Sequence, residues 1–485
     1  MSRISASLIS FRSFVLAGVV FICYVGLVFA GSLVYHSGLF FGQSNAQQLI
    51  SLVGNIRANS QRVLILFANN AEQRFGGGFI GTIGVIENDK GQMDIQDIRS
   101  VYYYDWVNNE SQYSALEVSD LLGPENFAGK GFLRNTGLYM NWPESGQFAL
   151  DAMGVNTGLA FDTVLQITPD ILIDILRITG PIYLEQYQLE VSAENFRSVV
   201  QLEIEAGKDK AEGQDPKTIL EILTNQLTKK LFDLNINSLY RISQDIVTDQ
   251  IAKKQIVGYS INPNIQKAFE DLNMTGELSD GADSYFSISE LTFLPNKSAY
   301  YIDQRIKQQI RISETGEAIV DLQIEREHTS DKAGYYWDPA NNFEAYLVND
   351  NINYSEIAIP RGSKMLASNI DPDQISSHQE ADRDIYQFKL DTKVLSTNQV
   401  HLRYSLPTKV QTTSDFDFEL LLQRSVGQKA SEYTIQVIPP QGFDLEGLVT
   451  NVQDPAYFSQ ADGSVVYTTT LDTDQLLRLK FNKAR

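Results

Sequence analysis

The chain has 485 residues, of which 43% are hydrophobic and 20% are charged, and its formal net charge at pH 7 is −21. This length allows two or three domains with cores of their own, and the composition is that of a globular protein. Because nucleic-acid binding needs a basic surface, the 60 acidic against 39 basic residues argue against a nucleic-acid partner.

Cysteine and histidine are too few and too scattered for the common thiol and metal motifs. The single cysteine, Cys23, lies in an apolar N-terminal run, which excludes a disulfide within the chain and CxxC-type metal sites. The four histidines, at positions 36, 328, 378 and 401, form no HExxH-type pair. We therefore expect no metal site and no cofactor.

The N-terminus carries an uncharged apolar run of 22 residues at 14–35. A helix of that length spans about 33 Å, against a hydrocarbon core of roughly 30 Å. Arg3 and Arg12 precede the run and the next cation is Arg57. This asymmetry predicts a single-pass membrane anchor with a cytoplasmic N-terminus, so that the bulk of the chain is extracytoplasmic.

A cleaved signal peptide is the alternative, because residues 28–30 satisfy the small-residue cleavage rule. The apolar run continues past that point, and its length favours the anchor. The bulk of the chain is extracytoplasmic in either case.

A helix is predicted next, followed by a glycine-rich segment between two strand-like runs. The first run, residues 63–67, ends before Asn69 and Asn70, and a second begins at residue 79. Between them lie one charged pair and three consecutive glycines, so we expect a strand–loop–strand unit. The aromatic residues 102–104 are expected to continue a further strand.

The following segment has the pattern of an α/β domain. Residues 162–167 are strand-like, residues 168–170 open an apolar helix, and a second strand is expected at 182–189, which suggests a βαβ crossover. Helical patterns then continue to about residue 272.

The C-terminal half alternates between apolar and polar residues with a period of two. Residues 310–312 and 320–324 flank a Glu-Thr-Gly turn and predict a hairpin. Further strands are expected at 354–359, 384–390, 400–406, 416–422, 433–438, 465–470 and 476–481. This pattern predicts an antiparallel β-sandwich region of one or two modules.

The sequence thus predicts a multidomain protein of the mixed α/β and α+β class. Its parts are a cytoplasmic tail at 1–12, a transmembrane anchor at 13–36, a juxtamembrane helix at 37–61, an α/β domain at 62–284 and the β-sandwich region at 285–485.

The glycine-rich segment is the leading candidate for a ligand site. It spells GxGxxG at residues 76–81, but a loop precedes it and a strand follows, which excludes a dinucleotide site. An arginine beside glycine-rich backbone suits phosphate or carboxylate recognition. The predicted ligand-binding set is Arg74, Glu72, Asn70, Gly77, Gly78, Arg99, Asp105, Arg134, Asn141 and Asp162. The alternative is that Arg74 pairs with a nearby carboxylate and only stabilises the loop. No catalytic residue is assigned.

Residues 69–81, NNAEQRFGGGFIG, resemble the signature of a bacterial envelope family known as domain of unknown function 4012. Residues 141–145, 161–164 and 179–182 resemble further segments of it. Phe75 stands where that family has proline, and Asn135 where it has aspartate. The resemblance implies a place in the cell envelope and no settled activity.

The order of anchor, α/β ectodomain and late strand–helix–Gly-Pro unit is also similar to the LytR-CpsA-Psr wall-polymer transferases. That similarity implies that Arg74, Arg99 or Arg134 would hold a pyrophosphate and that Asp105 or Asp162 would hold a divalent metal.

Two functions follow, and the question of catalysis stays open. The favoured one is a membrane-anchored, non-enzymatic surface protein that contacts envelope polymer or envelope proteins. The alternative is a transferase, or a binder of polyprenyl-pyrophosphate-linked polymer. The sequence assigns no oligomeric state.

Overall fold

The structure is a computed structural model, and it describes residues 45–90, 92–107, 133–207, 218–232, 234, 246–293, 297–330, 334–338, 343–452, 455–460 and 462–483. The predicted tail and anchor, residues 1–36, lie outside the described residues. Among the helices that the structure describes, none combines the length and apolar character needed to cross a membrane.

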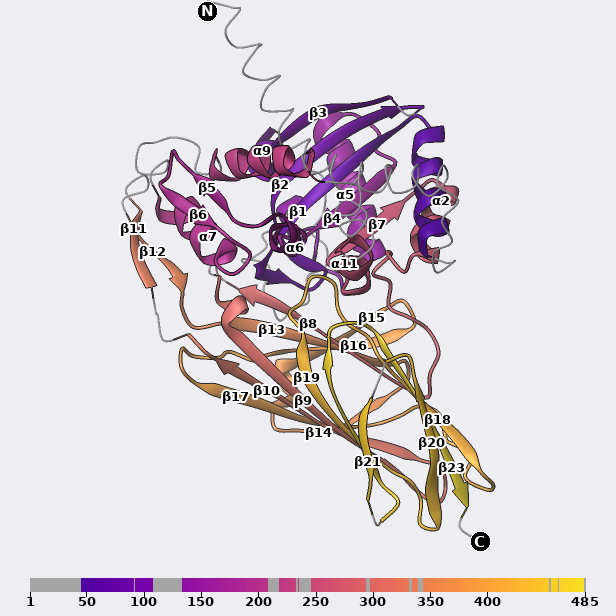
Figure 1. Ribbon diagram of the computed structural model, residues 1–485. Coiled ribbons are helices and arrows are strands. Elements are labelled where there is room, and N and C mark those ends of the chain that lie inside the picture. Colours follow the sequence, from indigo (N-terminus) through magenta and orange to yellow (C-terminus); the bar gives the residue numbers. More distant parts are fainter. Residues whose placement is uncertain are drawn as a thin grey trace, which may run out of the picture.

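A mixed α/β region is followed by a largely β region, as the sequence predicts (Figure 1). In Figure 1 the indigo and magenta α/β region lies above the orange and yellow strands, and the C-terminus is at the end of the β region remote from the helices.

The α/β region is built on a five-stranded sheet in the order β3-β2-β1-β4-β7. The strands are β1 (Gln61–Arg74), β2 (Gly77–Asp89), β3 (Gln92–Ser100), β4 (Thr163–Ile167) and β7 (Ile256–Ser260). β1 and β4 are parallel, and the other neighbours are antiparallel.

Helices cover both faces of this sheet. They are α2 (Asn45–Ala58), α3 (Val101–Val107), α5 (Trp142–Thr157), α6 (Asp170–Thr179), α7 (Phe196–Ala206), α9 (Thr218–Phe232), α11 (Thr248–Ala252) and α12 (Pro263–Asp271), with a short 3-10 turn η1 (Leu133–Asn135). Successive side chains of a strand point to opposite faces. Accordingly Val63 and Ile65 enter one apolar core, with α2 and α6, while Leu64 and Leu66 enter the other, with α5.

Three expectations for this region are wrong. β1 runs without a loop to Arg74 and bulges between Asn69 and Gln73, so the glycine-rich segment is the end of a tight hairpin. Among the described residues the strand after α6, β5 (Ile182–Leu184), pairs with β6 (Leu189–Val191) and not with β4. The expected βαβ crossover of β4, α6 and β5 is therefore not formed, and the parallel partner of β4 is β1. The aromatic run at 102–104 is helical, in α3.

The β region contains two seven-stranded sheets, in the orders β14-β17-β10-β9-β19-β22-β21 and β15-β16-β13-β8-β18-β23-β20. The strands are β8 (Ser284–Phe293), β9 (Ile302–Ile312), β10 (Ala318–His328), β13 (Ile352–Pro360), β14 (Lys364–Ser368), β15 (Ile375–Glu380), β16 (Arg383–Lys389), β17 (Thr397–Ser405), β18 (Phe416–Leu422), β19 (Ser431–Ile438), β20 (Phe443–Thr450), β21 (Ala456–Ser459), β22 (Val465–Leu471) and β23 (Gln475–Lys483). Two 3-10 turns, η3 (Ser298–Tyr301) and η4 (Pro372–Gln374), and a separate hairpin of β11 (Gly334–Asp338) and β12 (Phe343–Val348) complete the region.

One apolar core lies between the two sheets, with Phe286 and Phe418 from one sheet and Ile310 and Val320 from the other. The hairpin expected at 310–324 is confirmed as β9–β10, with Ala318 opposite Ile312. The expectation of a purely antiparallel region is wrong, because β9 pairs with β19 and β8 with β18 in parallel.

The outer face of the sheet that contains β8 packs against the end of the β1–β2 hairpin. Phe75 and Met140 of the α/β region share a buried cluster with Tyr285, Leu291 and Ile385 of the β region. We call this contact between the two regions the junction.

Candidate functional site

Arg74 lies buried in the junction, where its guanidinium donates hydrogen bonds to three groups. Nη1 donates to the carbonyl oxygens of Gln73, at 2.9 Å, and Thr292, at 3.2 Å, while Nη2 lies 3.3 Å from Oε1 of Glu72. The side chain is only 10% exposed. Arg74 therefore joins the β1–β2 hairpin, residues 61–89, to β8, and we call this hairpin the signature hairpin because it contains residues 69–81.

Glu72 is paired from both regions, because Lys297 reaches its second carboxylate oxygen. Burial acts to raise the pKa of Glu72, but the charges of Lys297 and Arg74 outweigh it and hold this pKa below its ordinary value. Glu72 is thus an ionised carboxylate between two cations, one on each side of the junction.

Asn70 belongs to a different site, at the end of β4 where α6 begins. Its Nδ2 donates to Oδ2 of Asp170 at 2.7 Å, and its Oδ1 accepts from Nη1 of Arg197 at 2.9 Å. Arg197 closes the triangle with a 2.6 Å ion pair to Asp170. Burial acts to raise the pKa of Asp170, but Arg197 and the hydrogen bonds of Asn70 and Thr168 lower it overall.

This triangle borders a pocket of about 240 Å³ at the junction. Its lining carries four basic residues, Arg177, Arg197, Arg424 and Lys429, against the acidic residues Asp170 and Glu194. Arg424 is held in place by the carbonyl oxygens of Lys253 and Leu471, at 2.9 and 3.0 Å. We call this the junction pocket.

The other charged residues of the predicted set form local pairs away from this pocket. Arg134 binds the buried Asp105 at 2.9 Å, and burial raises the pKa of Asp105. Arg99 on β3 pairs with its neighbour Asp97. Asp162 accepts a 2.9 Å hydrogen bond from the backbone N–H of Arg62, at the opposite end of β1 from Arg74.

Asn141, the residue before α5, connects segments of the junction. Its Oδ1 accepts from the backbone N–H of Leu278 at 3.0 Å, and its Nδ2 donates to Glu144 at 3.1 Å. Its own backbone N–H donates to Glu380 of the β region at 2.7 Å.

The two glycines of the predicted set, Gly77 and Gly78, allow neighbouring groups to lie close to the backbone of the hairpin. Gly77 has φ +130°, and a Cβ there would collide with Nε2 of Gln166, which donates to the carbonyl of Gly76 at 2.8 Å. A Cβ on Gly78 would lie 2.6 Å from the carbonyl group of Asn69 in the facing strand.

The structure therefore does not gather the predicted set into one cavity. It pairs Glu72 with Arg74 and Asp105 with Arg134, and of the set only Asn70 lines the junction pocket. The ligand-binding role of these residues stays a prediction.

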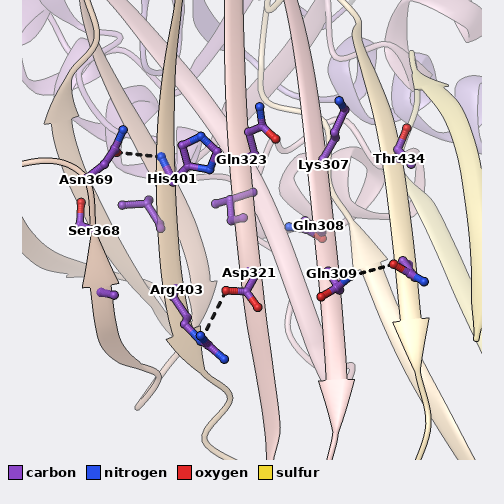
Figure 2. A pocket seen from close by; sticks show the side chains of 14 residues that line it. Lys307, Gln308, Gln309, Asp321, Gln323, Ser368, Asn369, His401, Arg403 and Thr434 are labelled. Atoms are coloured by element: carbon purple, nitrogen blue, oxygen red, sulfur yellow. Dashed lines mark hydrogen bonds and ion pairs between the residues drawn. The ribbon is translucent and has the colours of Figure 1, made fainter.

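A second hollow, of about 570 Å³, lies on the outer face of the sheet formed by β14, β17, β10, β9 and β19. We call it the groove, and Figure 2 shows its polar side chains. Strand register places these in two rows: His401, Gln323, Lys307 and Thr434 lie side by side, as do Arg403, Asp321, Gln309 and Gln436.

The two rows differ in how far their polar groups are already paired. In the second row, Arg403 lies 3.4 Å from Asp321, and Gln309 donates to Gln436 at 2.8 Å. In the first row, Gln323 donates to Gln399, a neighbour on β17. Among the described residues, the side chains of His401, Lys307 and Thr434 make no hydrogen bond or ion pair.

The groove was not predicted from the sequence, although part of its signal was present. The alternation that predicted β9 and β10 also places Lys307 and Gln309, or Asp321 and Gln323, on the solvent face of the strands. That β17 and β19 flank these two strands depends on the tertiary fold.

Comparison with solved structures finds remote similarities. A candidate nutrient-binding protein of Legionella pneumophila is 12% identical, with 41% of this chain and 71% of that chain covered and a TM-score of 0.26. A Streptococcus agalactiae protein is 15% identical, with coverages of 45% and 75% and a TM-score of 0.23. An M1 zinc metallopeptidase from Deinococcus radiodurans is 9% identical, with a TM-score of 0.20, and the match covers 37% of this chain and 42% of the peptidase. With TM-scores this low, these similarities assign neither fold nor activity.

A search of the curated proteins found no match. The family comparison is positive: residues 59–204 match the model described as "Protein of unknown function (DUF4012)", and this range includes the signature hairpin, α5 and the β4–α6 unit. The chain therefore carries, at residues 59–204, a domain of the DUF4012 family.

Proposed function

We propose that the protein is a membrane-anchored, extracytoplasmic binding protein of the cell envelope, and that its groove binds a hydroxyl-rich envelope polymer. The observation that carries this proposal is the first row of the groove, which crosses β17, β10, β9 and β19 and in which the side chains of His401, Lys307 and Thr434 are unpaired among the described residues.

The chemistry of the groove matches a polysaccharide. Amides, hydroxyls and imidazole both donate and accept hydrogen bonds, as sugar hydroxyls do. His401, Gln323 and Thr434 supply such groups in the first row, and Gln309 and Gln436 supply them in the second. An open groove admits a chain that enters and leaves at its ends.

The charge of the groove favours a polymer with anionic groups. Lys307 is exposed, and it forms no ion pair among the described residues even though the chain carries a net charge of −21. An unpaired cation in an acidic protein attracts anions locally, and the attraction weakens as salt screens it.

The extracytoplasmic location rests on the sequence, through the apolar run at 14–35 and the arginines that precede it. Protease added to intact spheroplasts tests it directly. Digestion of the β region from outside, without lysis, supports the location, and protection until lysis contradicts it.

Co-sedimentation of the full chain with purified wall fragments tests the polymer proposal. We expect wild type to sediment with the fragments and the double variant Lys307→Ala/Gln323→Ala to lose at least roughly 10-fold in affinity, the equivalent of 1.4 kcal/mol. Lys480→Ala, which removes an exposed lysine from β23, is the matched control and should bind as wild type does. Equal binding by all three proteins would contradict the proposal that the groove is the polymer-binding site.

A second candidate function is supported by the junction pocket, whose four basic residues suit a phosphate-containing ligand. This is the alternative of an envelope pyrophosphate binder, in which Arg177 and Arg197, and not Arg74, bind the pyrophosphate group. Inorganic pyrophosphate is the probe: it should raise the melting temperature of wild type and do so less for Arg177→Gln. Arg361→Gln, an exposed arginine outside the pocket, is the control. An unchanged melting temperature in wild type counts against this function.

A further inference from the structure

Two glutamates and one histidine meet on the junction face of the second sheet. Glu356 comes from β13, and His378 and Glu380 come from β15, two strands away. His378 and Glu380 are two residues apart, so both side chains lie on one face of their strand. One oxygen of each carboxylate and one ring nitrogen of His378 all lie within 4.8 Å of one another.

The two carboxylates are buried, and neither is paired with a lysine or an arginine among the described residues. Glu356 is 2% exposed and Glu380 is 3% exposed. Among the described residues neither forms an ion pair with lysine or arginine, and the only ion pair of Glu380 is with His378, at 3.0 Å. Buried carboxylates are normally paired or coordinate a metal, because an isolated buried charge is costly.

The hydrogen bonds around the cluster leave one oxygen of Glu356 without a partner. Gln387 of β16 donates to Oε1 of Glu356 at 2.8 Å, while Oε2 of the same carboxylate is buried and has no hydrogen-bond partner among the residues that the structure describes. On Glu380, Oε2 accepts from the backbone N–H of Asn141 at 2.7 Å, and Oε1 lies against Nε2 of His378. Each carboxylate is therefore held by a donor on one oxygen, as carboxylate ligands of metals are.

These distances fit a bound transition metal. Zinc binds imidazole nitrogen and carboxylate oxygen at about 2.0–2.2 Å, so that two ligands of one tetrahedral ion lie about 3.5 Å apart. The three ligand atoms lie within 4.8 Å of one another, so side-chain shifts of about 1 Å or less bring them into this range. The side chain of His378 is 37% exposed, which leaves a side open for water ligands and for entry of the ion.

We propose that Glu356, His378 and Glu380 bind one divalent transition-metal ion, Zn²⁺ or Mn²⁺, at the junction. Imidazole with two carboxylates is a donor set that suits these ions. Because Glu380 also holds the N-terminal end of α5 through Asn141, a bound ion strengthens the contact between the α/β region and the β region.

Titration of the metal-stripped full chain, purified in detergent, with ZnCl₂ and with MnCl₂ tests this proposal. We expect one ion per chain for at least one of the two salts, together with a rise in melting temperature. Glu356→Gln and His378→Gln should each weaken metal binding by at least roughly 100-fold. Loss of a residue that only supports a ligand costs up to about 100-fold in metal affinity, and loss of the ligand itself should cost no less. Glu446→Gln, which alters an exposed glutamate on β20, is the matched control and should bind as wild type does.

Glu356→Gln also separates a metal site from a merely structural cluster. The substitution keeps the shape of the side chain and replaces one ligand oxygen by an amide group, so the metal-free variant should melt no lower than metal-free wild type and lose only the rise that metal causes. If this variant fails to fold, His378→Gln, whose side chain is partly exposed, answers the same question. Absence of stoichiometric binding, or equal binding by both variants and wild type, overturns the proposal.

Discussion

The ammonium group of Lys254 lies 2.9 Å from the carboxylate of Asp474, and this pair joins the two regions of the chain. Lys254 is 1% exposed. Burial lowers its pKa, and Asp474 acts in the opposite direction. The carbonyl of Lys254 also accepts from the backbone N–H of Gly427 at 3.0 Å, and Asp474 accepts from that of Arg424 at 2.8 Å.

Asp474→Asn should therefore destabilise the protein strongly. It leaves a buried ammonium group without a counter-charge, and breaking a buried pair in this way costs about 3 kcal/mol or more. Urea unfolding of the full chain measures the loss. Asp382→Asn, which removes an exposed partner of Arg361, should change the free energy of unfolding by less than about 1 kcal/mol. Equal effects of the two substitutions would contradict the role assigned to Lys254 and Asp474.

Gly427→Ala should weaken the contact between the β region and the signature hairpin. Gly427 has φ +67°, and a Cβ there would lie 2.8 Å from the Cα of Gly77 in the signature hairpin. Both the left-handed backbone and the facing backbone oppose a side chain, so we expect a loss of roughly 1–3 kcal/mol. Gly447→Ala is the control, because nothing lies within 4 Å of a Cβ at that position. A melting temperature lowered equally by both substitutions would contradict a steric clash at Gly427.

Glu72 should make the junction sensitive to acid. Its folded-state pKa lies below the ordinary value of 4.5, so its stabilising contribution is present above that value and is lost as the pH falls through the folded-state pKa. At neutral pH, Glu72→Gln should be less stable than wild type, because Lys297 and Arg74 lose their shared anion. Below pH 4.5 the two melting temperatures should converge. A difference that stays constant from pH 7 to pH 3 would contradict this prediction.

Arg326 and Glu290 form a buried pair within the β region, 3.4 Å apart and no more than 5% exposed. Burial raises the pKa of Glu290 and lowers that of Arg326, so each charge depends on the other. Arg326→Met should cost about 3–5 kcal/mol, because it leaves the carboxylate unpaired. The double variant Arg326→Met/Glu290→Gln should recover part of that loss in urea unfolding. Additive losses would mean that the pair is not coupled.

Local patterns account for the elements that the sequence predicted correctly. The β9–β10 hairpin follows from apolar residues at every second position around a turn with Gly316 at φ +80°. Strand β8 was not predicted, because its apolar residues change phase, from Phe286 and Ile288 to Leu291 and Phe293, and nearly the whole strand is buried on both faces. The parallel pair β9–β19 joins segments more than 100 residues apart, which no local signal specifies.

The candidate sites divide in the same way. The sequence by itself determined two strand-like runs and the glycine-rich segment with Arg74 between them, because all of these are encoded within about 30 consecutive residues. Only the tertiary structure decided that Arg74 points into the junction, since Thr292 and Lys297, which surround it and Glu72, come from the β region. Side-chain direction depends on partners that are brought together by packing, and those partners are distant in the sequence.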